Sequence, residues 1–264
     1  MATSVTVSFL GTGSGIPSAD RFFSSTLLHR QGGHLLIDAG EPCAHLLMDR
    51  GDLLQEINAL LITHGHVDHI GGVPAMLQGC KLLGRTRHLP IYLPEEMIAP
   101  LRAWISALYL PEEGLGFQIS WIGWKNGEKI TLNEEISVTP HRNGHLDQCY
   151  RKSPGADPLR PCDSYSLEIE SGECRIVFSG DLASPSELKR LLKQPIMLLV
   201  CELSHFRADQ LADVLQGASI ETLCLVHLSE EYAEERSELK MRMEELLPKL
   251  QDVVLPEDGE VLDF

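Results

Sequence analysis

A short apolar run that ends in three histidines and an aspartate constrains this chain more than any other feature. Residues 59–62 carry nothing polar and include a β-branched residue, which is typical of a buried strand. The motif that follows is His64-Gly65-His66-Val67-Asp68-His69. On extended backbone His64, His66 and Asp68 can point the same way, whereas His69 points elsewhere. Imidazole and carboxylate bind zinc and similar divalent ions, so the segment predicts a site that can serve two adjacent metals.

The overall composition narrows the class of protein. A chain of 264 residues with 43% hydrophobic residues can bury a sizeable core, and we predict a single domain over residues 1–264. The formal net charge of −16 argues against broad nonspecific binding to nucleic acid and against an anionic membrane surface. No apolar run approaches membrane-spanning length, so no membrane partner is expected.

The number and spacing of the cysteines indicate the cellular compartment of the protein. The seven cysteines are scattered, and no pair shows C-x-x-C spacing. An odd number without a signal peptide fits a reducing environment, so we predict a cytoplasmic protein. The sequence assigns the cysteines no role.

Several predicted strands end in a residue of metal-ligand type, and this regularity extends the first motif. The strand ends are His64, Asp181, Glu202 and His227. If these ends lie on one edge of a sheet, histidines and carboxylates from distant segments converge, as in a catalytic metal site. Strands and helices interleave without a simple βαβ rhythm, which predicts a mixed sheet system covered by helices.

Turn signals predict further local structure. Residues 117–124 and 128–132 indicate two strands joined by the turn at Asn126-Gly127. Residues 231–250 indicate a helix with a heavily charged outer face, and residues 253–261 a final hairpin-like pair.

Two segments leave alternatives open. Residues 11–18 contain three glycines that could cradle a phosphate, but the pattern is not G-x-G-x-x-G. A turn that closely approaches a ligand or another loop is the plainer interpretation. Lys81, Arg85, Arg87 and His88 form the most basic short segment, which is either a solvated loop or a rim that steers anions.

The motif at residues 64–69, with His145, Asp181 and His227 downstream, resembles the metallo-β-lactamase superfamily of dinuclear metal hydrolases. Phe9-Leu10-Gly11-Thr12-Gly13, with Pro17, Arg21 and residues 36–41, is similar to the opening of the ribonuclease Z-like branch. The resemblance covers nearly the whole chain. It implies a four-layer αββα sandwich, an α/β fold with mixed sheets.

The resemblance also implies site residues. His64, His66 and His145 would bind one metal, Asp68, His69 and His227 the other, and Asp181 would bridge them. The two divalent ions would be zinc in the first place, with manganese or iron also suited to these ligands. Asp68 would also orient a bridging hydroxide, and His205, supported by Glu202, would protonate the leaving oxygen.

The roles of two further positions are ambiguous in the sequence. His141 and His145 follow the same predicted strand. The Val138-Thr139-Pro140 start with His145 seven residues past Val138 resembles the phosphodiesterase members, which implies His145 as the ligand and His141 as a supporting or rim residue. Asp38 is either an orienting partner of a ligand histidine or a simple strand-end residue.

The resemblance implies a phosphodiesterase whose substrate is RNA, cut at the 3′ end, or a small cyclic or nucleotide phosphodiester. Residues 146–163 form only a Pro-rich loop where RNA-processing members often insert a basic arm, which weakens the RNA alternative. The competing functions are a lactone or thioester (carboxyl-ester) hydrolase and a non-catalytic metal-binding sensor. Relatives often form homodimers.

Overall fold

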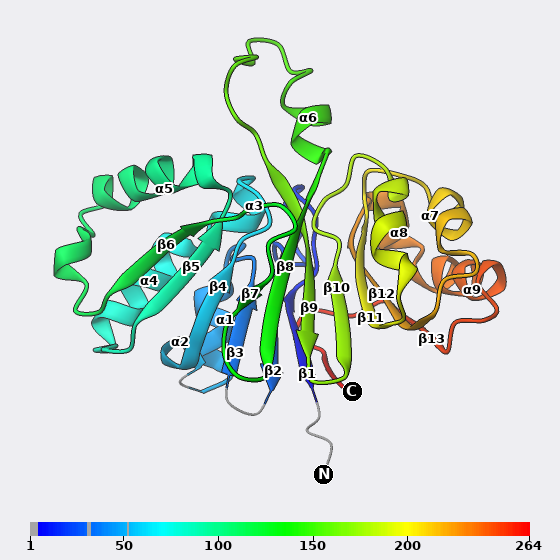
Figure 1. The fold of residues 1–264 in the computed structure, drawn as a ribbon, viewed down its shortest axis with the longest axis horizontal. Coiled ribbons are helices and arrows are strands. Elements are labelled where there is room, and N and C mark those ends of the chain that lie inside the picture. The colour runs from blue at the N-terminus through cyan, green and yellow to red at the C-terminus, as the bar shows by residue number, and fades with distance from the viewer. Residues whose placement is uncertain (1–4, 31–32, 52) are drawn as a thin grey trace. The chain divides into compact units, whose positions relative to one another are not determined.

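The computed structural model describes residues 5–30, 33–51 and 53–264. Its contacts divide the chain into two compact units, Met1–Trp124 with Glu257–Phe264 and Lys125–Pro256. Each unit contains one seven-stranded sheet with helices packed on it (Figure 1). The mixed α/β architecture is confirmed, whereas the single domain over residues 1–264 stays a prediction.

The sheet of the first unit combines antiparallel and parallel strands. Its spatial order is β14 (Val261–Asp263), β1 (Thr6–Gly11), β2 (Ser25–Arg30), β3 (Gly33–Ile37), β4 (Ile57–Leu61), β5 (Leu89–Leu93) and β6 (Ile119–Gly123). The strands from β3 to β6 run parallel, so their carboxyl ends lie at the same edge. Nearly every side chain in β4 is buried, as its apolar sequence predicts.

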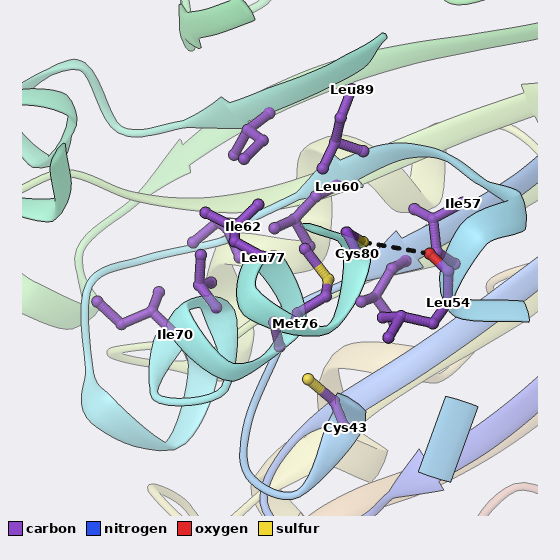
Figure 2. Packing of buried hydrophobic residues seen from close by; sticks show 14 of the residues in the cluster. Cys43, Leu54, Ile57, Leu60, Ile62, Ile70, Met76, Leu77, Cys80 and Leu89 are labelled. Atoms are coloured by element: carbon purple, nitrogen blue, oxygen red, sulfur yellow. Dashed lines mark hydrogen bonds between the residues drawn. The ribbon is translucent and has the colours of Figure 1, made fainter. Parts of the chain in front are cut away.

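Helices cover this sheet and close its core. They are α1 (Cys43–Asp49), α2 (Leu53–Glu56), α3 (Val67–Ile70), α4 (Val73–Leu82) and α5 (Glu95–Ala107), followed by the 3-10 turn η1 (Glu112–Gly114). Figure 2 shows Leu60 and Ile62 packed against Met76 and Leu77 of α4, with the Cys80 thiol donating to the Leu54 carbonyl. This aliphatic core fixes α4 directly after the histidine motif.

The second unit has its own mixed sheet. The order is β13 (Asp252–Val254), β12 (Ile220–Leu228), β11 (Ile196–Leu203), β10 (Cys174–Phe178), β9 (Ser164–Ser171), β8 (Ile136–Asn143) and β7 (Ile130–Thr131). Its helices are α6 (His145–Cys149), the 3-10 segment η2 (Pro185–Lys193), α7 (Ala208–Leu215), α8 (Glu230–Glu234) and α9 (Arg236–Leu246). The parallel strands β10, β11 and β12 pack their apolar side chains against η2, α7 and α9. Within the described ranges, none of the helices has the length and apolar character needed to cross a bilayer.

Two predicted hairpins are wrong although their strands exist. The Asn126-Gly127 turn forms, with a positive φ of 75° at Gly127, but β6 and β7 belong to different sheets. In the tail, β13 pairs in parallel with β12, and β14 pairs antiparallel with β1. Short strands carry too little side-chain pattern to specify a partner, so the available sheet edges decided the pairing.

The predicted helix over residues 231–250 is interrupted. The chain forms α8 and α9 with a break at Glu235, and it leaves the helical conformation before Pro248. Proline disfavours the helical conformation in the residue before it, which explains the early end.

The basic segment contains one structural residue, Arg85, whereas Arg87 and His88 are exposed, as in a solvated loop. Arg85 is 2% exposed, and its guanidinium donates to the carbonyls of Gln55, Ile57, Arg87 and His88 at 2.8–3.1 Å. The segment precedes β5, whereas the histidine motif follows the carboxyl end of the parallel strand β4. Arg85 is therefore neither solvated nor part of an anion-steering rim beside that motif.

Replacing Arg85 with methionine is expected to destabilise the protein by about 3 kcal/mol, because several buried carbonyls lose a charged donor. Urea unfolding followed by circular dichroism measures the loss. Arg87→Met is the matched control, since Arg87 is half exposed in its ion pair with Glu56 and is expected to contribute less than about 1 kcal/mol. Equal losses in the two variants would contradict the structural role of Arg85.

Candidate functional site

The histidine motif of the first unit lies where β4 ends and α3 begins. His64 is fully buried, and His66 keeps an extended backbone with φ −69° and ψ 150° as the N-cap of α3. Asp68 and His69 lie in the first turn of that helix. The expected extended backbone therefore stops at His66, and a helical turn presents the last two ligand-type residues.

These four side chains form two close pairs. His64 Nε2 lies 3.0 Å from His66 Nδ1, and His69 Nε2 lies 3.4 Å from Asp68 Oδ2. The His64 and His69 rings are 4.1 Å apart between centroids. The structure thus gathers all four candidates of the first unit at one place.

Asp38 orients this group. Its Oδ2 lies 2.7 Å from His69 Nδ1, and its Oδ1 accepts from the Thr63 backbone N–H at 2.8 Å. Asp38 has a positive φ of 56°, which is uncommon for a residue other than glycine. Of the two alternatives for Asp38, the structure shows the orienting partner.

Thr63 was not singled out from the sequence. It is buried, and its Oγ1 lies 2.9 Å from Asp38 Oδ2 and 3.1 Å from His64 Nδ1. It therefore links the aspartate to both His64 and, through Asp38, His69. Its position directly before the motif was the available signal.

Replacing Asp38 with asparagine is expected to lower metal affinity roughly 10–100-fold, because His69 loses the carboxylate that orients its ring. Competition with a chromophoric chelator measures the affinity. Asp49→Asn, at an exposed position of α1, serves as the control and should leave it unchanged. An unaltered affinity in the Asp38 variant would refute the orienting role.

The second unit carries the other strand-end residues. β10, β11 and β12 run parallel, so Asp181, Glu202 and His227 emerge at one edge of the sheet, as predicted. His64 follows β4 of the other sheet, so the prediction of a single edge for all four strand ends is wrong. Asp181 and His227 are buried, and His227 has a positive φ of 48°. His145 begins α6, so residues 146–149 of the predicted loop are helical.

Ligand-type atoms converge here as well. Asp181 Oδ2 lies 3.6 Å from His145 Nε2 and 3.5 Å from His227 Nε2. Asp181, His205 and His227 each offer a ligand atom within 4.8 Å of the other two. The structure therefore brings together all the predicted site residues of this unit.

Glu202 holds His205 in place. Its Oε1 lies 2.9 Å from His205 Nδ1 and accepts from the Leu182 backbone N–H at 2.9 Å. Its Oε2 accepts from the backbone N–H groups of Ser204 and His205. Glu202 is 1% exposed, and one buried carboxylate thus fixes both the His205 ring and the backbone next to Asp181.

His141 has a different partner from His145. It is on β8, and its Nε2 lies 2.7 Å from Glu168 Oε2, whereas His145 is beside Asp181. Glu168 also accepts from Arg175. The placement agrees with the choice of His145, whose role as a ligand stays a prediction.

The Glu168 contacts predict a pH dependence of stability. Hydrogen bonding from His141, together with Arg175, lowers the pKa of Glu168 to about 2. A depressed pKa stabilises the fold above the ordinary value near 4.5, and this contribution is lost as the pH falls towards 2. Glu168→Gln is expected to cost about 3 kcal/mol at pH 7. Denaturant unfolding across pH should show the difference from wild type narrowing below pH 4.5, and a constant difference would contradict this origin.

The spacing of the donor atoms fits bound metal. A tetrahedral ion with bonds of about 2.0–2.1 Å to nitrogen or oxygen places neighbouring ligand atoms about 3.3 Å apart. The four pairs within the units measure 3.0, 3.4, 3.5 and 3.6 Å. The carboxylate–imidazole contacts of Asp38 and Glu202 are shorter, at 2.7 and 2.9 Å, as expected for direct hydrogen bonds.

Comparison with known proteins agrees with this architecture. The Ribonuclease Z of Natronomonas pharaonis is 25% identical over 310 residues, covering 99% of this chain and 98% of the relative. The metallo-beta-lactamase fold protein YhfI from Bacillus subtilis has a TM-score of 0.78 at 18% identity, covering 99% of this chain and all of that one. The short form of human tRNase Z has a TM-score of 0.71 at 22% identity, and the match covers 97% of this chain and 98% of that chain.

A family model described as "Anti-Pycsar protein Apyc1" matches residues 5–246, which include every candidate ligand of both units. The chain therefore belongs to this family, within the ribonuclease Z-like branch of the metallo-β-lactamase superfamily, and it is a metal-dependent hydrolase.

Proposed function

We propose that the protein is a phosphodiesterase with a dinuclear metal centre. His64, His66 and His145 would hold one ion, Asp68, His69 and His227 the other, and Asp181 would bridge the two. Zinc suits these ligands, as do manganese and iron. When bound, such ions supply a water of lowered pKa as nucleophile and offset negative charge on phosphoryl oxygens.

The pair His205–Glu202 is the observation that favours phosphodiester chemistry. His205 is accessible, with a side chain 33% exposed, and Glu202 occupies its Nδ1. Its Nε2 is therefore the nitrogen that can protonate a leaving oxygen, and the buried carboxylate stabilises the charged ring. Cleavage of a lactone or thioester has less need of such a donor beside the metals.

The remaining residues orient the proposed ligands. Asp38 holds His69, and Thr63 supports both Asp38 and His64. Glu202 accepts the Leu182 N–H and so fixes the backbone that carries Asp181. A site prearranged in this way does not have to reorganise when charge develops on the phosphoryl group.

A small phosphodiester, cyclic or derived from a nucleotide, fits this chain better than a long RNA. The net charge of −16 disfavours binding of a long polyanion. Residues 146–163 form only a short Pro-rich loop where RNA-processing members carry a basic arm. The scattered cysteines favour a cytoplasmic location, and a homodimer is the expected assembly. A carboxyl-ester hydrolase and a metal-binding sensor are the competing functions.

Hydrolysis of bis(p-nitrophenyl) phosphate by purified protein tests the proposal, with metal content measured on the same samples. We expect turnover that disappears on chelation and returns with zinc or manganese. Protein that holds two metals per chain without cleaving this ester would refute the phosphodiesterase, and lactone and thioester substrates would then be assayed. Protein without bound metal after reconstitution would refute the dinuclear centre.

A further inference from the structure

A loop near the start of the chain packs beside the aspartate of the histidine motif. A Cβ built on Gly15 would lie 3.4 Å from Asp68 Oδ2. The Asp258 carboxylate holds this loop, because its Oδ1 accepts from the Thr12 backbone N–H at 2.8 Å and from Thr12 Oγ1 at 2.7 Å. Of the two alternatives from the sequence for residues 11–18, the close approach to another loop is therefore present.

A buried tryptophan holds the strand end that leads into the motif. Trp124 is 4% exposed, and its indole N–H donates to the Ile62 carbonyl at 2.7 Å. The indole also stacks on Tyr92 of β5, with ring centroids 5.2 Å apart. The next residue, Thr63, donates its backbone N–H to Asp38. Side chains from distant segments therefore fix the backbone just before His64 by hydrogen bonds.

A packing contact of a different kind acts on Gly65, which separates the first two histidines. Met97 lies in the first turn of α5, half-buried against the apolar core of the first unit. A Cβ built on Gly65 would lie 2.7 Å from Met97 Sδ, 2.9 Å from Cε and 3.1 Å from Cγ. The end of the thioether thus occupies the space that a side chain at position 65 would need, and only glycine allows this contact without displacing it.

The contact restricts the peptides that join two ligand-type histidines. His64 Nε2 and His66 Nδ1 lie 3.0 Å apart, and both rings can face one ion only while the backbone on either side of Gly65 keeps its direction. Glycine has more backbone freedom than other residues, so a side chain packed on it removes more motion than the same contact elsewhere. The unbranched methionine side chain suits such an irregular gap, and apolar cover also controls the access of water to a metal site.

We propose that Met97 is a positioning residue of the metal site, whose thioether packs on Gly65 and so fixes the separation of His64 and His66. The inference rests on the proposed dinuclear centre and adds to it a residue that is not a ligand. Met97 acts through the peptides next to Gly65, so the two residues should behave as one unit when they are replaced.

Stepwise affinities for zinc, measured by competition with a chromophoric chelator, test this role. Met97→Ala is expected to weaken one of the two affinities roughly 10-fold, as for other residues that support metal ligands. Met97→Leu should restore most of the affinity, because leucine conserves the apolar volume. Ile98→Ala is the matched control, since Ile98 follows Met97 in α5 and packs against the same core. It separates a loss of stability from a loss of positioning.

Gly65→Ala tests the same contact from the other side. The added methyl group would displace the flexible end of Met97, so this variant should lose the contact that Met97→Ala loses. The double variant should then bind zinc no more weakly than either single variant, because residues in contact have non-additive effects. Gly114→Ala is the control, since a Cβ there would make only ordinary contacts, at 3.6 Å and beyond. Losses that multiply in the double variant would overturn the inference.

The absorption spectrum of the cobalt-loaded protein reports ligand geometry independently of activity. We expect the spectrum to change in Met97→Ala and to stay as in wild type in Ile98→Ala. Unchanged zinc affinities in Met97→Ala, or an equal loss in Ile98→Ala, would refute the role of Met97. Wild-type protein that binds two ions but cleaves no phosphodiester would refute the proposed activity alone, and the zinc affinities would still decide the role of Met97. Wild-type protein that binds no metal would refute both.

Discussion

Replacing His205 with alanine is expected to lower kcat roughly 10²–10⁴-fold for a phosphodiester with an alkyl leaving group, and less for bis(p-nitrophenyl) phosphate, while the metal content stays unchanged. The ring is held through Nδ1 by Glu202, which leaves Nε2 to protonate the departing oxygen. Removing it takes away the proton donor without removing a ligand of either proposed ion. Turnover and metal content measured on the same preparation check both parts of this expectation.

Metal retention decides between two roles for His205. A ligand atom of His205 lies within 4.8 Å of ligand atoms of Asp181 and His227, so the ring is also close enough to share their metal. Loss of one metal from His205→Ala would show a ligand and would contradict the donor. His45→Ala is the matched control, because His45 lies on the exposed surface of α1 and should leave turnover and metal content unaltered. A substrate with a more acidic leaving alcohol should recover part of the lost rate, since it needs less protonation.

Replacing Asp181 with asparagine is expected to reduce bound metal below two ions per chain and to lower kcat/KM by roughly 10³-fold. Its Oδ2 lies between His145 Nε2 and His227 Nε2, at 3.6 and 3.5 Å, and an amide oxygen carries no charge to neutralise the ions. Metal ions stabilise transition-state charge by several kcal/mol, and each 1.36 kcal/mol is about tenfold in rate. Mass spectrometry under native conditions counts the ions, and the ester assay gives the rate.

Asp213→Asn provides the control for this change, because Asp213 is exposed on α7 of the same unit. Unfolding curves of the two variants without metal should match the wild type closely. Two retained ions together with a rate near that of wild type would contradict a bridging role for Asp181.

Local pattern was sufficient to identify much of the candidate site. The motif at residues 64–69 and the strand ends at Asp181, Glu202 and His227 are visible because ligand-type residues rarely follow apolar strands by chance. Parallel β10, β11 and β12 then bring their ends to one edge, as expected. Buried strands were recognisable for the same reason, since their apolar runs are local.

Other features depended on contacts between distant residues. The roles of Asp38 and Arg85 were ambiguous in the sequence, because their partners are a histidine 31 positions away and carbonyls up to 30 positions away. The partners of β6, β7, β13 and β14 were misassigned or unassigned, because short strands pair with whichever sheet edge is available. Asp258 lies 246 positions from Thr12, and no periodicity links them.

The sequence by itself determined which side chains have the chemistry to bind metal and which segments are buried, because both properties belong to the residues and their near neighbours. Only the tertiary structure decided that Asp38 orients His69, that Arg85 is structural, and that Asp258 holds the loop beside Asp68. Those outcomes depend on hydrogen bonds of about 2.7–3.0 Å between atoms far apart in the chain, and such distances exist only after the strands have paired.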